Sequence, residues 1–202
     1  MHDIREPRVA GTAVSAPWGW PHLWVFLFTV AYLVPFAVAC IRGGNREFIL
    51  YLLVMLTLIP AVVWLHARVH IHAATLWGLS LWGLAHLAGG LLTIPEQWPH
   101  AGEPVLYNWW LVPSRLKYDQ VVHAFGFGLS TWICWQGVRA AFRHRGIAIR
   151  PSAGLLVLCI LGGMGLGALN ELVEFVAVMT IPDTNVGGYE NTGWDLVANA
   201  VG

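Results

Sequence analysis

Long apolar runs dominate this chain and alternate with short polar segments. Five runs have the length of a bilayer crossing, and they cover residues 20–41, 48–65, 73–94, 118–138 and 153–181. A transmembrane helix needs roughly 20 mostly apolar residues, so each run predicts one span. A further helix is expected from residue 194, where the sequence ends after nine residues at 202. The pattern predicts an all-α, polytopic transmembrane helix bundle of five full spans plus the start of a sixth, which is expected to be incomplete.

Polar segments define the expected domain organisation. Residues 1–19 are polar and contain several Pro and Gly, which predicts a cytoplasmic tail. Residues 20–202 then form a single transmembrane helical domain. Segment 95–117 carries four prolines and several aromatic residues, and is expected to lie on the membrane surface as an aromatic lid. Segment 182–193 is acidic and rich in Gly, and is expected to be a loop.

The composition agrees with the membrane class. Only 11% of the residues are charged and 57% are hydrophobic, whereas a soluble domain has about 25% charged residues. The net charge is zero, which argues against a nucleic-acid partner. Lys and Arg number seven on the side of the N-terminus and four on the opposite side. The excess predicts a cytoplasmic N-terminus.

Two carboxylates interrupt the last long apolar run. Glu171 and Glu174 lie one helical turn apart, and an ionisable residue inside a span costs roughly 2.5 to 3.5 kcal/mol. We therefore expect partners on other spans. Counting from the predicted helix ends at 1.5 Å per residue, four segments place polar groups roughly 5 to 14 Å below the outer surface. These groups are His86, Asp119, His123, Asn170, Glu171, Glu174, Asp195 and Asn199.

Small residues share helix faces with these polar groups. Gly163 and Gly167 lie on the same side of their helix as Asn170 and Glu174. Small residues let helix backbones approach, so that polar groups can meet across the contact. The pattern predicts a polar cluster among the third to sixth helices. The first two spans lack such groups and are expected at the periphery.

Three interpretations of the cluster remain open. The groups can be interhelical hydrogen bonds that only stabilise the bundle, or a pocket of carboxylate–His pairs that handles protons or a lipid head group. They can also bind a divalent transition metal such as Zn, Fe or Mn, since imidazole and carboxylate suit these ions. The expected metal ligands are Glu171, Glu174, His123 and then His86. The groups expected to orient the ligands or contact a head group are Asp119, Asn170, Asp195 and Asn199.

The same residues carry a family resemblance. The motifs Tyr118-Asp119, His123, Asn170-Glu171-x-x-Glu174-Phe175 and Asn191-Thr192-x-x-Asp195-Leu196-x-x-Asn199-x-x-Gly202 resemble the YjdF-like family of bacterial inner-membrane proteins. That family brings no assigned biochemical function. More distantly, the order of these motifs is similar to the VanZ-like family, which is linked to glycopeptide resistance in the cell envelope. This chain has Gln120 and Glu174 where the VanZ-like pattern has lysine and glutamine.

These observations lead to one functional expectation and two alternatives. The expected protein lies in the bacterial inner membrane and acts on an envelope lipid or lipid-linked molecule, which enters beneath segment 95–117. The first alternative is a proton-coupled transporter or a lipid-binding protein without metal. The second is an accessory subunit of a membrane complex, in which the apolar spans contact a partner.

Overall fold

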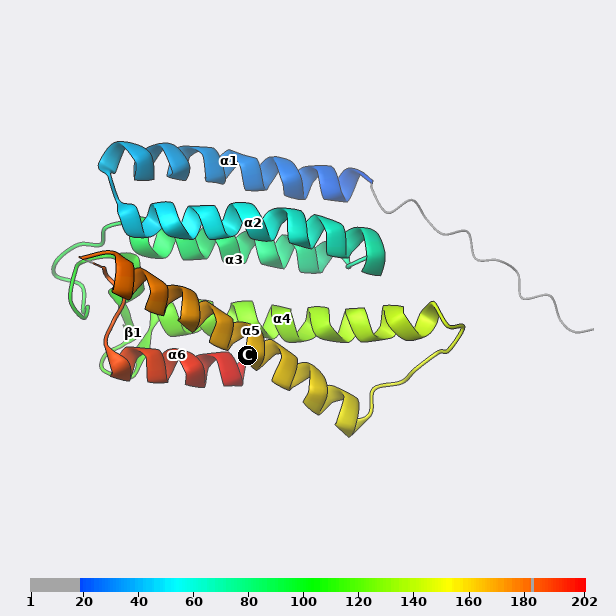
Figure 1. Cartoon of the computed structure of the whole chain (residues 1–202). Helices are drawn as coiled ribbons and strands as arrows, with labels where there is room; N and C mark the ends of the chain where they lie inside the picture. Colours follow the sequence, from blue (N-terminus) through cyan, green and yellow to red (C-terminus); the bar gives the residue numbers. More distant parts are fainter. Residues whose placement is uncertain (1–18, 183) are drawn as a thin grey trace, which may run out of the picture.

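The computed structural model describes residues 19–182 and 184–202. The tail expected over residues 1–19 lies outside the described residues, apart from Gly19. Figure 1 shows long helices lying side by side, with a short hairpin at one end of the bundle. The elements are α1 (Trp20–Gly43), α2 (Arg46–Val69), α3 (Ala73–Leu91), η1 (Leu106–Asn108), β1 (Trp110–Val112), β2 (Leu116–Lys117), α4 (Tyr118–Arg143), α5 (Ala153–Thr180) and α6 (Tyr189–Val201).

The first five helices follow the apolar runs, so the all-α prediction is confirmed for the bundle. The prediction for the sixth helix is wrong at its start, because α6 begins at Tyr189 instead of residue 194. Glu190 lies in its first turn, where a carboxylate favours the positive end of the helix dipole. Helix α4 also extends to Arg143, beyond the expected end at residue 138. Both differences arise where polar residues continue a helix past its apolar run.

Helix α4 occupies the centre of the packing. It makes its most extensive contacts with α5 and α6, and it also packs against α3. Helix α1 packs on the outside against α3 and α2. Figure 1 shows α5 crossing the bundle at a steep angle to α4, with α6 alongside. The start of α4 is therefore enclosed by α5 and α6.

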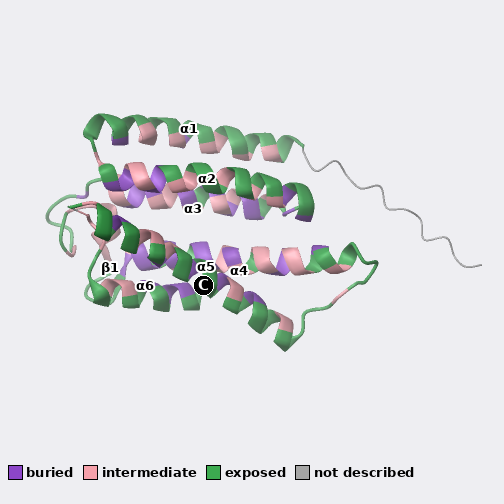
Figure 2. Ribbon diagram, viewed as in Figure 1, coloured by how far each residue is buried: buried purple, intermediate pink, exposed green. Residues whose placement is uncertain are grey.

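Apolar side chains cover the outside of the bundle. Three helices, α1, α2 and α5, are long and apolar enough to cross a membrane, with mean hydropathies of 2.3, 2.6 and 1.9. At most 17% of each apolar window is buried inside the protein. Figure 2 shows exposed residues along the outer faces of α1 and α5, and buried residues between the helices. An outward-facing apolar surface of this kind suits contact with lipid.

Glycines permit the closest helix approaches, as the sequence pattern predicted. A Cβ at Gly167 on α5 would lie 2.8 Å from Nδ2 of Asn199 on α6. A Cβ at Gly163 would lie 2.0 Å from Oγ1 of Thr131 on α4. Because these positions have no side chain, α5 can approach both neighbours and bring its carboxylates to them.

Candidate functional site

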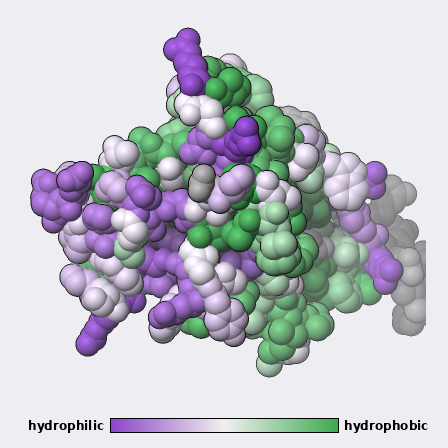
Figure 3. Space-filling model, turned by 60° about the vertical axis from the view of Figure 1, so that its left-hand side comes forward, coloured by the Kyte–Doolittle hydropathy of each residue, from purple (hydrophilic) through white to green (hydrophobic). Residues whose placement is uncertain are grey.

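The polar residues of the bundle gather at the end that carries the hairpin. Helix α4 begins there with Asp119 and His123, and α6 begins there with Asp195 in its second turn. The last turns of α5 supply Glu171 and Glu174. Figure 3, in which this end is turned forward, shows hydrophilic residues concentrated on it and hydrophobic residues further along the helices. Three of the four predicted segments thus meet around His123.

His123 lies at the centre of the cluster and is 4% exposed. Its Nδ1 lies 3.0 Å from Oδ1 of Asn199, and Nδ2 of Asn199 donates to Oε1 of Glu171 at 3.3 Å. An amide oxygen only accepts hydrogen bonds, so Nδ1 of His123 carries a proton. In the neutral ring the lone pair is therefore on Nε2.

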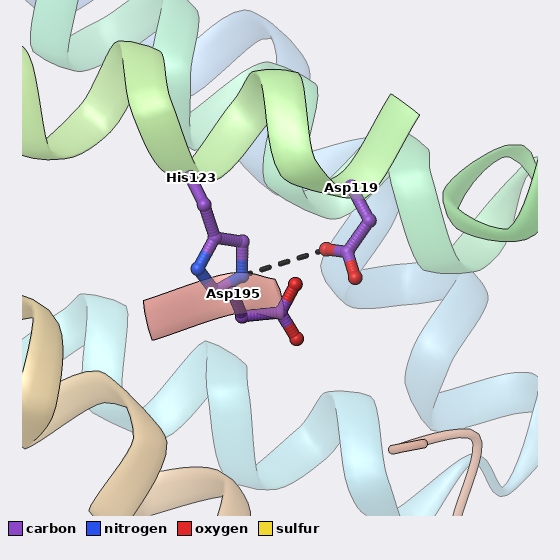
Figure 4. A group of neighbouring side chains, drawn as sticks. All are labelled: Asp119, His123 and Asp195. Atoms are coloured by element: carbon purple, nitrogen blue, oxygen red, sulfur yellow. Dashed lines mark ion pairs between the residues drawn. The ribbon is translucent and has the colours of Figure 1, made fainter. Parts of the chain in front are cut away.

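The Nε2 atom of His123 faces carboxylates. It lies 3.4 Å from Oδ1 of Asp119 and 3.9 Å from Oε1 of Glu174. Figure 4 shows His123 and Asp119 extending from α4 towards Asp195, whose carboxylate lies beside them. The two measured separations exceed the 2.7 to 2.9 Å typical of a charge-assisted hydrogen bond. A proton or a metal ion between these atoms would relieve the repulsion between the lone pair and the carboxylate oxygens.

Two groups of potential metal ligands share His123. The first is Asp119, His123 and Asp195, and the second is His123, Glu171 and Glu174. Within each group the ligand atoms lie within 4.8 Å of one another. Ligands held at about 2.1 Å around a tetrahedral ion lie roughly 3.4 Å apart. Either group would have to contract from separations of up to 4.8 Å to hold one tetrahedral ion with all three of its ligands.

Two carboxylate oxygens in the cluster have no hydrogen-bond partner among the described residues. They are Oε2 of Glu171 and Oδ1 of Asp195. The two residues are 8% and 1% exposed, respectively. A buried polar atom without a partner costs about 1 to 3 kcal/mol, and more if it is charged. If the cluster served only to join helices, we would expect these two oxygens to have hydrogen-bond partners.

One lysine belongs to the cluster and was not predicted from the sequence. Lys117, which is 8% exposed, places Nζ 3.9 Å from Oδ2 of Asp119 and hydrogen-bonds Oδ1 of Asn191. Asn191 in turn donates to Oδ2 of Asp195 at 2.6 Å. This chain of contacts ties the β2–α4 junction to α6. Lys117 is the only lysine in the sequence, and it contacts Asp119 directly and Asp195 through Asn191.

His86 lies apart from both ligand groups. Its Nδ1 hydrogen-bonds the hydroxyl of Tyr107, and its ring packs edge-on to Tyr51 at 5.6 Å. Asn170, which the sequence also placed here, donates to Oε1 of Glu174 at 2.9 Å. Of the predicted residues, the structure brings all but His86 into one contact network around His123.

A cavity of about 40 Å³ adjoins the cluster. One water molecule needs roughly 10 to 15 Å³ of cavity volume, so this cavity admits a few water molecules or a small polar group. Helix α2 contributes Glu47 and Tyr51, which corrects the prediction of a peripheral position for the second span, whereas no residue of α1 lines the cavity. The lining is Glu47, Tyr51, His86, Tyr107, Asn108, Asp119, Glu174, Asn185, Val186, Gly187 and Asn191.

Tyr107 brings segment 95–117 into the site. Its ring lies where a Cβ at Gly89 would be, at 2.5 Å, so the segment packs directly on α3. Burial raises the pKa of Tyr107 well above its ordinary value, and the charges of Asp119 and Glu174 raise this pKa further. The hydroxyl therefore stays protonated in its hydrogen bond with Nδ1 of His86.

Comparison with protein families gives one match. The model of a family described as predicted membrane protein (DUF2238) matches residues 22–202. The chain belongs to this family. DUF2238 is the YjdF-like family that the motifs indicated, so that prediction is confirmed. Comparison with curated proteins and with solved structures finds no match.

This DUF2238 protein is therefore a membrane protein with apolar helices, as the sequence predicted at the level of class. The polar residues of the motifs that carried the resemblance are spread over α4, α5 and α6, and six of them lie in the ligand groups and hydrogen bonds around His123: Asp119, His123 itself, Glu171, Glu174, Asp195 and Asn199. The residues that sequence reasoning missed are Glu47, Lys117, Tyr107 and Asn191. They come from helix ends and from the loop, where hydrophobic periodicity provides no signal.

Proposed function

We propose that this protein binds a divalent transition metal at His123, close to the outer surface of the bacterial inner membrane. The observation that carries the proposal is the lone pair of Nε2, which faces Asp119 at 3.4 Å and Glu174 at 3.9 Å. In this arrangement the protein has five full spans and a partial sixth, with a cytoplasmic N-terminus. Helix α3 supports this count, since its 19 residues extend about 28 Å, close to the thickness of a bilayer core.

The geometry favours a specific division of roles. Nε2 of His123, Asp119, Asp195 and Glu174 are the proposed ligands. Glu171 and Asn199 contact the opposite nitrogen of the ring and hold it in orientation, as partners of metal-bound histidines commonly do. The sequence analysis expected Asp119 and Asp195 to orient the ligands or contact a head group, whereas this proposal makes them ligands themselves. His86 instead lines the adjoining cavity with Tyr107.

The proposed activity is on an envelope lipid or lipid-linked molecule. A metal at this position would supply a Lewis acid next to the cavity. The hydroxyls of Tyr51 and Tyr107 and the amides of Asn108 and Asn185 line that cavity and can bind a polar group. Segment 95–117 covers this end of the bundle, so a substrate from the outer leaflet would enter beneath it.

Metal analysis of the purified full chain tests the proposal. We expect about one equivalent of Zn, Fe or Mn in the wild type and a loss of most of it in His123→Ala and Asp195→Asn. Glu103→Gln is the matched control, because Glu103 is an exposed acidic residue of segment 95–117 and lies outside both ligand groups. Absence of stoichiometric metal from the wild type, after purification without chelators and after reconstitution, would overturn the proposal.

A proton can take the place of the metal ion, and this gives the alternative function. His123 would then be an imidazolium held between Asp119 and Glu174, as in a proton-coupled transporter. Further along α4, Ser130 donates to its own helix at the carbonyl of Gly126 and Phe127 is buried. Those residues offer few groups for a proton path, so the metal site is the preferred proposal. A role as an accessory subunit remains the third proposal and predicts co-purification with a partner.

A further inference from the structure

A second cavity lies at the opposite end of the bundle. It also measures about 40 Å³, and it lies between the end of α2, the start of α3 and the last turns of α4. From Asp119 to Arg139 helix α4 extends about 30 Å at 1.5 Å per residue, so the two cavities are separate. The lining is Val69, His70, His72, Gln136, Arg139 and Arg143.

Hydrogen bonds fix the inner wall of this cavity. Gln136 is 4% exposed, and its Oε1 accepts from the backbone N–H of His72 at 2.8 Å. Its Nε2 donates to Oγ1 of Thr75 at 2.9 Å. Both polar atoms of the amide are therefore occupied by the protein, and the α2–α3 connection is held against α4. The cavity is consequently a formed feature of the fold, with the basic side chains placed around it.

Among the described residues, the charge around the cavity has no carboxylate partner. Arg139 and Arg143 are exposed, and neither makes an ion pair with another described residue. No carboxylate of the described residues lies at this end of the bundle. The acidic residues of the described part lie at the other end, and they are Glu47, Glu96, Glu103, Asp119, Glu171, Glu174, Glu190 and Asp195.

This end also has the features of a membrane interface. Trp20 and Trp64 are 76% and 60% exposed, and they lie in the first turn of α1 and near the end of α2. The guanidinium of Arg68 lies 5.4 Å from the centre of the Trp64 ring. Exposed Trp residues of this kind sit at the level of lipid head groups. The cavity therefore lies where a phospholipid presents its phosphate.

We infer that this cavity binds a phosphate group, supplied by the head group of an anionic phospholipid. Two guanidinium groups can form paired hydrogen bonds to phosphate oxygens, and His70 and His72 add further donors. Helix α3 starts here without a side-chain cap, so its first N–H groups and the positive end of its dipole add to the attraction. The inference does not depend on the metal site at His123.

Thermal unfolding of the full chain in a nonionic detergent tests this inference. The probes are short-chain phosphatidylglycerol, short-chain phosphatidylcholine and inorganic phosphate. We expect phosphatidylglycerol to raise the unfolding temperature with saturation, and phosphatidylcholine to have a smaller effect. Arg139→Gln/Arg143→Gln should weaken the apparent affinity about ten-fold or more. The single variant Arg143→Gln, at an exposed helix end, serves if the double variant does not fold.

Arg145→Gln is the matched control, because Arg145 is an exposed basic residue of the same region and does not line the cavity. The control should bind phosphatidylglycerol like the wild type. If inorganic phosphate alone gives a saturable shift that the double variant loses, the phosphate site is supported and its source is the free anion. A phosphatidylglycerol response equal in the wild type, the control and the double variant would overturn the inference, as would no response to either phosphate source.

Discussion

The two ring nitrogens of His123 face different partners, and this difference determines which nitrogen is available to a metal ion. Nδ1 contacts the amide oxygen of Asn199 at 3.0 Å, whereas Nε2 faces the carboxylates of Asp119 and Glu174. A hydrogen bond at one ring nitrogen decides which nitrogen can bind a metal. In the proposed metal site Asn199 is therefore a positioning residue, because it would act on the metal through the ring.

At this scale the first prediction concerns Asn199. In Asn199→Ala, the ring of His123 loses the partner of Nδ1, and Glu171 loses the donor of Asn199. Partners of metal ligands commonly contribute 10- to 100-fold to affinity, so we expect the metal affinity to fall by about that factor. Competition with a chelator of known affinity measures the change. Asn108→Ala, at the same end of the bundle, should leave the affinity unchanged, and an unchanged affinity in Asn199→Ala would contradict the assigned role.

The second prediction at the residue scale concerns Tyr107. Tyr107→Phe leaves Nδ1 of His86 without its hydroxyl partner, which should cost about 1 to 3 kcal/mol of stability. Because the pKa of Tyr107 is raised in the folded state, its hydroxyl ionises at lower pH in the unfolded chain than in the folded protein. The stability that Tyr107 contributes is therefore fully present below pH about 10 and is lost as the pH rises above it. Unfolding followed across this range should show the variant losing less stability with rising pH than the wild type. Parallel pH profiles would contradict the prediction.

Only some of the residues of the site could be predicted from the sequence. Glu171 and Glu174 were detectable because a carboxylate in an apolar run is costly and needs a partner. Lys117 was not detectable, since a basic residue at a helix start ordinarily faces solvent. Its position beside Asp119 and Asn191 depends on how the hairpin turns the chain into α4. That turn depends on long-range packing and has no periodic signal.

At the scale of elements, the approach of α5 to α6 depends on Gly167. A Cβ there would lie 2.8 to 2.9 Å from three atoms of Asn199, whose amide is already bonded to His123 and Glu171. Because this side chain cannot move away freely, Gly167→Ala should destabilise the protein by about 1 to 3 kcal/mol. For Gly167→Ala we expect both a lower unfolding temperature and a lower metal content than in the wild type.

Gly165→Ala provides the control on the same helix. A Cβ at Gly165 has no neighbouring atom within 4 Å, and alanine is the better helix former by roughly 0.5 to 1 kcal/mol. We therefore expect Gly165→Ala to be neutral or slightly stabilising. Equal unfolding temperatures for the two variants would show that α5 and α6 do not make the close contact described.

Elements were predicted best where apolar length alone determines them. Helices α1 and α5 match their apolar runs closely because a span must satisfy its own backbone in lipid. The early start of helix α6 was missed because most residues from Tyr189 to Gly193 are poor helix formers by propensity. Contacts of Asn191 with Lys117 and Asp195 compensate for that deficit. The role of α2 was missed because Glu47 looked like part of a charged turn.

For the whole molecule, charge is divided between the two ends of the bundle. The acidic residues of the described part lie at the hairpin end together with Arg42, Arg46, Arg115 and Lys117, whereas the described residues of the other end carry only basic charge, at Arg68, Arg139, Arg143, Arg145 and Arg150. Basic residues next to spans are retained on the cytoplasmic side. From this rule we expect the arginine cavity in the cytoplasmic leaflet and the His123 cluster near the outer surface.

Cysteine labelling in intact cells tests this orientation. The native Cys40, Cys134 and Cys159 are first replaced by alanine, and a cysteine is then introduced as Glu103→Cys or Arg150→Cys, both at exposed positions. A membrane-impermeant maleimide should label Glu103→Cys in intact cells and Arg150→Cys only after permeabilisation. The reverse pattern would place the His123 cluster on the cytoplasmic side, and a substrate in the outer leaflet could then not reach it. Labelling of both positions in intact cells would contradict α4 as a full span, because their segments precede and follow this helix.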